Sequence, residues 1–326
     1  MITIALFNNK GGVGKTTLVY HLAHMFSRIG YPTVAVDLDP QANLTSAFFD
    51  EDELEKLWDD SGQTIMACIS PILEGTGDIR APELLSITDT LSVVGGDLGL
   101  SRFEDKLSES WPKGYNSDAA ALRATSAFHR IIHQAGDSIE AALAILDVGP
   151  NLGAINRAAL LSADFLVIPL AADLFSLQGL KNLGPTVRGW RGQWSQVRTL
   201  VSGKTTIDLP DGQMDPAGYV VLQHAVRLDR PVRAYGRWLK RIPAVYREAV
   251  LNEQPPVLDV EGSSDANCLA TLRNYRSLMP MAQDARKPMF DLRAADGAIG
   301  SHAQLVLTCA QEFEQLARVI ADKCGL

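Results

Sequence analysis

Short apolar runs alternate along the chain with segments whose apolar residues recur at helical spacing. Residues 2–7 form the first apolar run, which predicts a buried strand. Apolar residues then recur three or four apart over 18–29 and predict a helix that ends at Gly30. Residues 33–38 predict a second strand. This strand–loop–helix–strand order is typical of two parallel strands joined by a right-handed crossover.

The same alternation continues to the end of the chain. Further strands are expected at 91–94, 143–148, 165–170 and 219–222, and further helices at 103–107, 119–135 and 303–322. The pattern predicts an α/β fold: a doubly wound, mostly parallel sheet flanked by helices, forming a single domain over residues 1–326. Peripheral insertions are expected at about 50–90, 108–118 and 200–218. Residues 108–118 are predicted to be a loop, and Asp208–Gly218 a hairpin or a mobile loop.

Composition narrows the protein class. Apolar residues make up 46% and charged residues 21%, as is usual for soluble globular proteins. The four cysteines lie far apart with no C-x-x-C pair, which disfavours a local zinc or iron–sulfur site and fits a cytoplasmic location. No apolar run is long enough to cross a membrane, and a strand at the very start leaves no room for a signal peptide.

The strongest chemical signal is the glycine-rich segment between the first strand and the first helix. It reads Lys10-Gly11-Gly12-Val13-Gly14-Lys15-Thr16-Thr17. Its end fits the general P-loop pattern, although Asn9 stands where that pattern has its first glycine. Backbone N–H groups of such a turn, with the following helix N-terminus, bind phosphates. Lys15 would then reach the β- and γ-phosphates of ATP, and the Thr16 hydroxyl would ligate Mg²⁺.

Acidic residues follow two of the predicted strands. Asp37 and Asp39 end the second strand, and Asp147 ends the run 143–148. A carboxylate near the γ-phosphate can orient the attacking water and help to hold the metal, which suits Asp39. One at the next strand end can hold Mg²⁺, which suits Asp147. The alternative is that these acids merely terminate strands, as many acids do.

Several segments together resemble the ParA/MinD superfamily of P-loop ATPases. Lys10–Thr17 resembles its deviant Walker A motif, and Asp37–Asn43 resembles its D-x-D-P-Q-x-N segment. Asp147–Gly153 is similar to the switch D-x-P-P-S-L-G, with Gly149 in place of the first proline. Residues 163–180 resemble the block A-D…I-P…F-x-L-x-G-L. The resemblance is close over 1–48 and 140–185 and loose over 90–107 and 215–256.

The resemblance implies roles for individual residues. Lys10 would cross the interface of an ATP-dependent homodimer and contact phosphates bound to the opposite subunit. Asp39 would position the attacking water and help the metal. In the loosely matching part, Gln223 and Pro243 would lie near the adenine, although Gln223 is equally well explained as the polar end of a strand.

Charge is distributed unevenly. The chain has a net charge of −8, yet residues 181–247 contain 12 Lys and Arg against 4 Asp and no Glu. If helical, Arg233, Arg237, Lys240 and Arg241 share one face, which could neutralise DNA phosphates without reading sequence. A second group surrounds two tryptophans: Arg188, Arg191 and Arg198. The alternative is a solvated cationic face with the tryptophans packed inward.

These observations lead to one main hypothesis. The chain is expected to be a slow, Mg²⁺-dependent, ParA-like ATPase whose ATP dimer binds nonspecific DNA and a partner protein of ParB type. Hydrolysis would release both, in plasmid or chromosome partition, so the protein would associate with the nucleoid. Sequence-specific binding is not expected, because no helix-turn-helix segment precedes residue 1. Membrane binding of the MinD kind is not expected either, because residues 318–326 lack a Lys/Arg-rich face.

Two other hypotheses remain open. One is a nucleotide-gated adaptor that recruits a partner complex without binding DNA; the acidic run 50–60 and the segment 200–218 would then be partner surfaces. The simpler interpretation of the acidic run is a solvated helix face or surface loop. The other is a metal-cluster scaffold, which the cysteine pattern disfavours.

Overall fold

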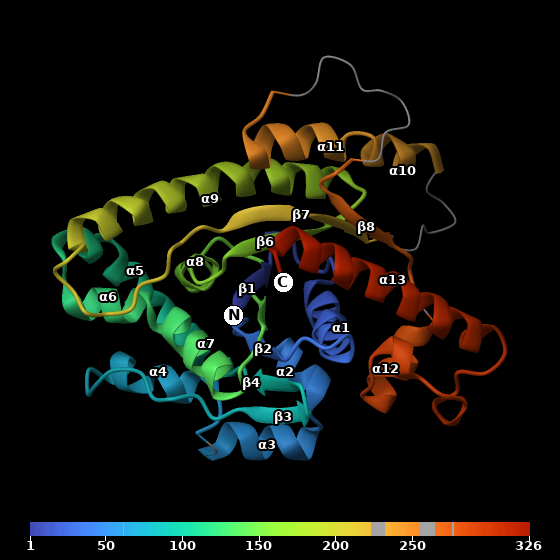
Figure 1. Ribbon diagram of the computed structural model, residues 1–326, viewed down its shortest axis with the longest axis horizontal. Helices are drawn as coiled ribbons and strands as arrows, with labels where there is room; N and C mark the ends of the chain where they lie inside the picture. The colour runs from blue at the N-terminus through green and yellow to red at the C-terminus, as the bar shows by residue number, and fades with distance from the viewer. Residues whose placement is uncertain (61, 223–231, 255–264, 276) are drawn as a thin grey trace.

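The computed structural model describes residues 1–60, 62–222, 232–254, 265–275 and 277–326, and at residue 60 and within 232–235 it describes the backbone only. These residues contain an eight-stranded sheet in the order β3-β4-β2-β5-β1-β6-β7-β8 (Figure 1). Neighbouring strands are parallel except for the edge pair β3 and β4. The strands are β1 (Ile2–Leu6), β2 (Thr33–Asp37), β3 (Leu85–Thr88), β4 (Leu91–Val94), β5 (Leu143–Asp147), β6 (Phe165–Ala171), β7 (Asp215–Leu222) and β8 (Cys268–Leu272). The predicted doubly wound, mostly parallel sheet is confirmed.

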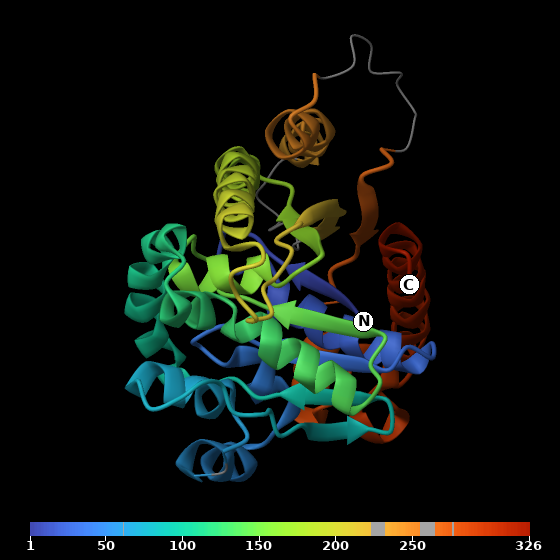
Figure 2. The ribbon, with the colours of Figure 1, turned by 60° about the vertical axis from the view of Figure 1, so that its left-hand side comes forward.

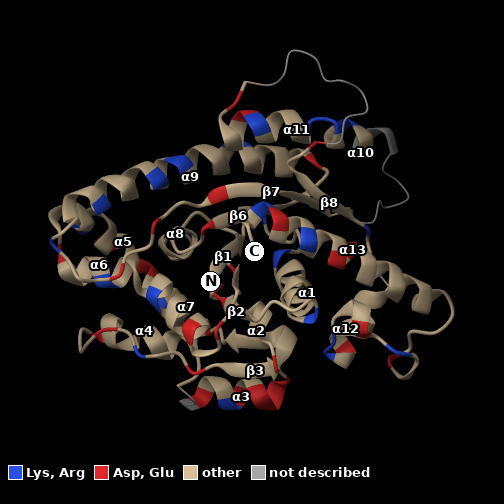
Figure 3. Cartoon of the chain, viewed as in Figure 1, with Lys and Arg blue, Asp and Glu red and all other residues tan. Residues whose placement is uncertain are grey.

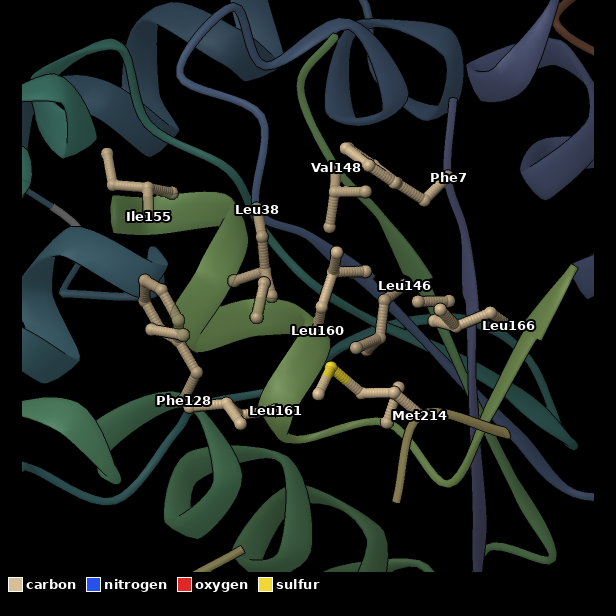
Figure 4. Close-up of a cluster of buried hydrophobic side chains, with 14 of the residues drawn as sticks. Phe7, Leu38, Phe128, Leu146, Val148, Ile155, Leu160, Leu161, Leu166 and Met214 are labelled. Atoms are coloured by element: carbon tan, nitrogen blue, oxygen red, sulfur yellow. The ribbon is translucent and has the colours of Figure 1, made fainter. Parts of the chain in front are cut away.

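Helices cover both faces of the sheet, as Figures 1 and 2 show. One face carries α4 (Ile65–Glu74), α5 (Phe103–Lys113), α6 (Ala119–Thr125), α7 (Ala127–Ser138), α8 (Ala154–Leu161) and α9 (Leu174–Val201). The other face carries α1 (Lys15–Arg28), α12 (Leu278–Ala285) and α13 (Ser301–Cys324). The central strands are apolar throughout because both faces are covered. Figure 4 shows part of the first core, where Phe128 and Leu160 lie near Leu38 and Leu146.

The remaining elements lie at the periphery. They are α2 (Asn43–Phe48), α3 (Glu51–Asp60), α10 (Val232–Leu239), α11 (Ile242–Val245), the π-helical turn η3 (Tyr246–Leu251), and the 3₁₀ turns η1 (Leu98–Arg102), η2 (Gly114–Asn116), η4 (Met289–Asp291) and η5 (Ala294–Asp296). The acidic run 50–60 falls largely on α3, and Figure 3 shows its acids along that helix. Glu51, Asp52, Glu53 and Glu55 are exposed, so the interpretation as a solvated helix face is confirmed.

Strand order reverses at β1, which lies between β5 and β6. In open α/β sheets the crevice at such a reversal, beyond the carboxyl ends of the strands, is where ligands bind. Register brings two acids to this edge, because Asp37 of β2 lies opposite Asp147 of β5. The strand order therefore places the glycine loop and the acidic strand ends together.

The predicted loop at 108–118 is wrong. Helix α5 continues to Lys113 and is followed directly by η2. Polar residues and Pro112 suggested a loop, but Leu107 and Ser110 are buried and Trp111 stacks on Trp194 of α9. Burial of one helix face thus overrode the local propensity.

Two further predicted elements differ from the structure. The helix expected at 119–135 is divided at Ser126, a fully buried residue whose hydroxyl donates to the Leu122 carbonyl. Asp208–Gly218 is not a hairpin, because β7 begins at Asp215 and pairs with β6 from there. The preceding segment is fixed under α9, where Trp194 Nε1 donates to the Pro210 carbonyl at 2.8 Å.

The C-terminal helix packs into the core, as expected. Cys309, Leu316 and Ala317 of α13 are fully buried against the second face of the sheet. Among the described residues, no helix combines the length and the apolar character needed to cross a bilayer.

Candidate active site

The glycine loop after β1 has a backbone that requires glycine. Gly12 and Gly14 have φ values of 70° and 79°, in the left-handed region. A Cβ at Gly14 would also lie 3.0 Å from Leu222 Cδ1. Asn8 fixes the start of the loop: its side-chain carbonyl accepts from the Lys10 N–H at 2.9 Å, and its amide donates to the Pro169 carbonyl at 2.7 Å. Contacts within the protein and the two glycines therefore define the shape of the loop.

Lys15 begins α1 and is buried beneath the loop. Its Nζ donates to the Lys10 carbonyl at 3.4 Å, and its side chain lies near Asp147 and Asp39. Burial lowers the pKa of Lys15, while those two carboxylates oppose the shift. A buried ammonium group is stabilised when an anion lies beside it, so the position of Lys15 favours a phosphate ligand.

Asp37 has a structural role. Its carboxylate accepts from the Thr45 N–H at 2.8 Å and from the Thr45 hydroxyl at 2.7 Å, which fixes α2 against β2. Burial raises the pKa of Asp37 to about 6. The backbone of Gly96 approaches so closely that a Cβ there would lie 2.7 Å from this carboxylate. The first acid of the pair thus positions the second, and Asp39 faces the cleft.

Asp147 is fully buried, and neither of its carboxylate oxygens has a partner in good hydrogen-bond geometry among the described residues, although the Thr16 hydroxyl lies close by. Burial, and then the negative charge of Asp37, raise the pKa of Asp147 well above its usual range. A buried carboxylate without a partner is costly, and a bound cation removes that cost. Asp147 and the nearby Thr16 hydroxyl are oxygen ligands of the kind that Mg²⁺ prefers.

No group of three or more His, Cys, Asp or Glu side chains among the described residues is arranged to hold a metal. A Mg²⁺ ion here would therefore draw part of its coordination from phosphate oxygens and water, as Mg²⁺ at nucleotide sites usually does.

A cleft of about 650 Å³ opens over the glycine loop. One wall consists of the loop, the first turns of α1 and α2; the other is α12 with the two residues that follow it. Its lining includes Gly11, Gly12, Gly14, Lys15, Thr16, Thr17, Asp39, Pro150, Met279, Gln283 and Arg286. The cleft thus joins the glycine loop and Asp39 in one space.

A narrower cavity of about 160 Å³ adjoins this cleft at the carboxyl ends of β7 and β8. Its walls are mainly apolar and include Leu18, Leu222, Tyr275 and Phe313, with Asn274 at its edge. The two cavities share Gly14, Thr17 and Met279. A polar cradle for phosphates is therefore continuous with an apolar slot.

Lys10 does not point freely out of the loop. Its ammonium group forms an ion pair with Asp173, the N-cap residue of α9, and lies 5.7 Å from the centre of the Phe175 ring. Leu174 and Phe175 beside it are 52% and 72% exposed. No local pattern in the sequence points to Asp173, because its contact with Lys10 joins residues 163 positions apart.

The structure describes only one of the two residues expected near an adenine. Pro243 lies in the first turn of α11, which packs against α9, and it lines neither cavity. Gln223 lies outside the described residues. Part of the slot's lining, Arg273 to Tyr275, follows β8, a short strand with polar Thr271 that the hydrophobic pattern did not reveal.

The two basic groups differ in the structure. Arg237, Lys240 and Arg241 are exposed on α10 and the turn after it, with both guanidinium groups over the Trp238 ring at 4.6 and 5.1 Å. The side chain of Arg233 lies outside the description.

The second group is used internally. Arg188 donates to the Ala249 carbonyl, while Arg191 and Arg198 pair with Asp215 and Asp211. Trp190 and Trp194 are buried, so the alternative with the tryptophans packed inward is correct for this second group.

Comparison with known proteins agrees with this geometry. A family model described as an AAA domain matches residues 1–196. The sporulation initiation inhibitor protein Soj of Bacillus subtilis is 31% identical over 185 residues, which is 57% of this chain and 64% of Soj. The chromosome partitioning protein ParA of Caulobacter vibrioides is 26% identical over 192 residues, 58% of this chain and 63% of ParA. The alignments thus span somewhat less than two thirds of these relatives.

Solved structures match over the full length. Protein DIP2308 of Corynebacterium diphtheriae superposes with a TM-score of 0.70 at 24% identity, covering 99% of both chains. A plasmid partition protein of Borrelia burgdorferi bound to AMPPNP has a TM-score of 0.60 at 17% identity, again with 99% of both chains covered. These likenesses show a shared fold. Together with the family match and the glycine loop, they place this chain in the ParA/MinD superfamily of P-loop ATPases.

Proposed function

We propose that this protein is a ParA-type ATPase that hydrolyses ATP to ADP and phosphate and uses nucleotide state to control dimerisation. The observation that carries the proposal is the buried carboxylate of Asp147, which lacks a partner in good hydrogen-bond geometry among the described residues and lies beside Thr16 and Lys15. A site with an unpaired cation-binding oxygen and a buried lysine under a phosphate loop suits a metal-bound triphosphate. ParA of Caulobacter vibrioides, a relative, is named for chromosome partitioning.

Each residue of the site has a role in this proposal. The backbone of Gly11 to Thr17 holds the phosphates, and Lys15 neutralises charge on the β- and γ-phosphates. Thr16 and Asp147 hold Mg²⁺, with Asp39 close by; the ion neutralises phosphate charge when bound. Asp39 orients the attacking water. The apolar slot beside Asn274 and Tyr275 receives the base.

Lys10 and its surroundings support a dimer. Its ion pair with Asp173 keeps it at the surface beside exposed Leu174 and Phe175. A lysine of the glycine loop beside two exposed apolar side chains forms a surface that a second copy of the chain would cover. Lys10 would then exchange Asp173 for the phosphates of the opposite subunit.

The exposed arginines of α10 support binding to nonspecific DNA. Figure 3 shows Lys and Arg along α9 and around α10, away from the acidic helix α3. Arg237 and Arg241 have no acidic partner among the described residues, so both remain available for phosphates. We propose that the ATP dimer joins two such surfaces on DNA, and that a ParB-type partner stimulates hydrolysis and release.

Two measurements test these proposals. In the first, Lys15→Ala should abolish ATP binding by calorimetry, whereas Lys106→Ala, a lysine remote from the cleft, should not. In the second, duplex binding is followed against salt with a non-hydrolysable ATP analogue. Affinity should fall steeply with salt. It should be lost in Arg237→Glu/Arg241→Glu but kept in the control Arg80→Glu/Arg102→Glu. ATP-dependent dimers that ignore DNA even at low salt would instead favour the nucleotide-gated adaptor.

A further inference from the structure

Helix α8 begins directly after the loop 148–153 that follows Asp147. Its N-cap residue is Gly153, which has no side chain to accept from the first free N–H groups of the helix. Glu104 of α5 supplies the missing acceptors: its carboxylate accepts from the Ala154 N–H at 2.6 Å and from the Ile155 N–H at 2.9 Å. Charge-assisted bonds of this kind, at the positive end of a helix dipole, are among the stronger ones.

The fit between the two helices is close. A Cβ at Gly153 would lie 2.7 Å from Glu104 Oε1, so a side chain at position 153 would displace the capping carboxylate. The cap joins segments about fifty residues apart. The residues of α8 itself therefore do not supply a side-chain cap in place of Glu104.

Asn156, which is buried in the first turn of α8, closes the loop from inside. Its side chain accepts from the Gly149 N–H at 3.1 Å and donates to the carbonyls of Gly149 at 2.9 Å and Asn151 at 2.7 Å. Pro150, at the middle of the loop, lines the cleft with Gly11. The start of α8 thus determines where the loop enters the cleft.

Helix α5 is itself held in place. The Trp111 ring stacks on Trp194 of α9 with centroids 5.9 Å apart, and its Nε1 donates to the Gln193 side chain at 3.2 Å. The guanidinium group of Arg157, on α8, also lies over the Trp111 ring, 4.0 Å from the ring centre. Glu104 therefore projects from a helix that is anchored to α9 and that contacts α8 at a second point.

We propose that Glu104 is a positioning residue for ATP hydrolysis. By capping α8 it holds the loop after Asp147, with Pro150, in the arrangement that hydrolysis requires, without touching nucleotide itself. This inference rests on the proposed ATPase function. It assigns α5 a task that neither the family motifs nor the cleft lining indicates.

The test compares Glu104→Gln with Asp105→Asn, which removes the same charge from the next, exposed position of α5. Glutamine keeps one acceptor and places an NH₂ group against the other N–H, so the cap is half lost. The turnover number should fall between about 5- and 100-fold, because small misplacements in an active site have effects of that size. KM and the ATP affinity should stay within about twofold, and Asp105→Asn should match the wild type.

Two additions make the result decisive. Glu104→Asp keeps the charge but is one methylene too short to reach both amides, and it should lose turnover as Glu104→Gln does. Hydrogen exchange should quicken at Ala154 and Ile155 in both Glu104 variants and not in Asp105→Asn. A merely stabilising role would lower the melting temperature without this selective loss of turnover.

Three outcomes would overturn the inference: unchanged turnover in both Glu104 variants, equal losses of turnover and ATP affinity, or the same loss in Asp105→Asn. A wild-type protein that binds ATP but does not hydrolyse it contradicts the proposed function itself. Exchange at Ala154 and Ile155 then still shows whether Glu104 caps the helix, so the two failures are distinguishable.

Discussion

Gly184 lies where helix α9 comes closest to the π-helical turn η3. A Cβ at this position would lie 1.8 Å from the Ala249 carbonyl oxygen, 2.5 Å from the Ala249 carbonyl carbon and 2.9 Å from Val250 Cα. All three are backbone atoms, so no side chain can rotate away. Gly184→Ala must therefore move η3 away from α9 by about 1.5 Å, since non-bonded heavy atoms prefer separations of about 3.5 Å.

The cost of this movement has two parts. Overpacking a close contact costs about 1–3 kcal/mol, and more where backbone must move. The movement also strains the hydrogen bonds that Arg188 donates to the carbonyls of Ala249 and Val250, at 2.5 and 3.0 Å, and bonds to charged donors contribute about 1.5–3 kcal/mol each. The better helix propensity of alanine returns up to about 1 kcal/mol. We expect Gly184→Ala to lower the free energy of unfolding by about 2–4 kcal/mol.

Helix α9 contains its own control. Nothing lies within 4 Å of a Cβ built at Gly192, so Gly192→Ala keeps the propensity gain without the clash and should stabilise by up to about 1 kcal/mol. Urea unfolding of both variants, followed by circular dichroism, measures the difference. The proposed DNA binding should weaken in Gly184→Ala alone, because η3 adjoins α11, which in turn contacts α10. If Gly184→Ala proves as stable as Gly192→Ala, the close approach of α9 and η3 is not the constraint described here.

Three further predictions concern side chains that can gain or lose a proton. Asp147→Asn should abolish ATP turnover yet raise the stability of the nucleotide-free protein by about 1–3 kcal/mol at pH 8, because a buried unpaired carboxylate is removed; thermal unfolding and phosphate release measure the two effects. Burial lowers the pKa of His21 to about 4, and its Nε2 accepts from the Met289 N–H at 3.0 Å. Neutral His21 therefore contributes on the order of 3 kcal/mol to the free energy of unfolding, fully above pH 6.5, and this contribution is lost as the pH falls toward 4. Urea unfolding between pH 6.5 and 4 should therefore depend less on pH in His21→Gln than in the wild type. Asp173→Asn should release Lys10 and shift the nucleotide-dependent monomer–dimer balance toward dimer, as light scattering would show; an unchanged balance would mean that this ion pair does not restrain dimerisation.

Local sequence determined the phosphate loop and most of the sheet. Gly12 and Gly14 adopt positive φ, which glycine does without steric cost, and a short apolar run bounded by such a turn favours a buried strand. Asp147 was identified for the same reason, since an acid at the end of such a strand stays at the sheet edge whatever the helices do. These features depend on neighbours within a few residues.

Tertiary structure decided what depends on distant partners. The ion pair between Lys10 and Asp173 and the cap that Glu104 provides for α8 join segments far apart in the chain, and no local pattern encodes such pairs. The polar residues and the proline near Trp111 predicted a loop, but the segment is helical because Trp111 stacks on a tryptophan of α9. Proximity in sequence indicates which chemistry a strand end can offer, whereas packing decides which side chains meet there.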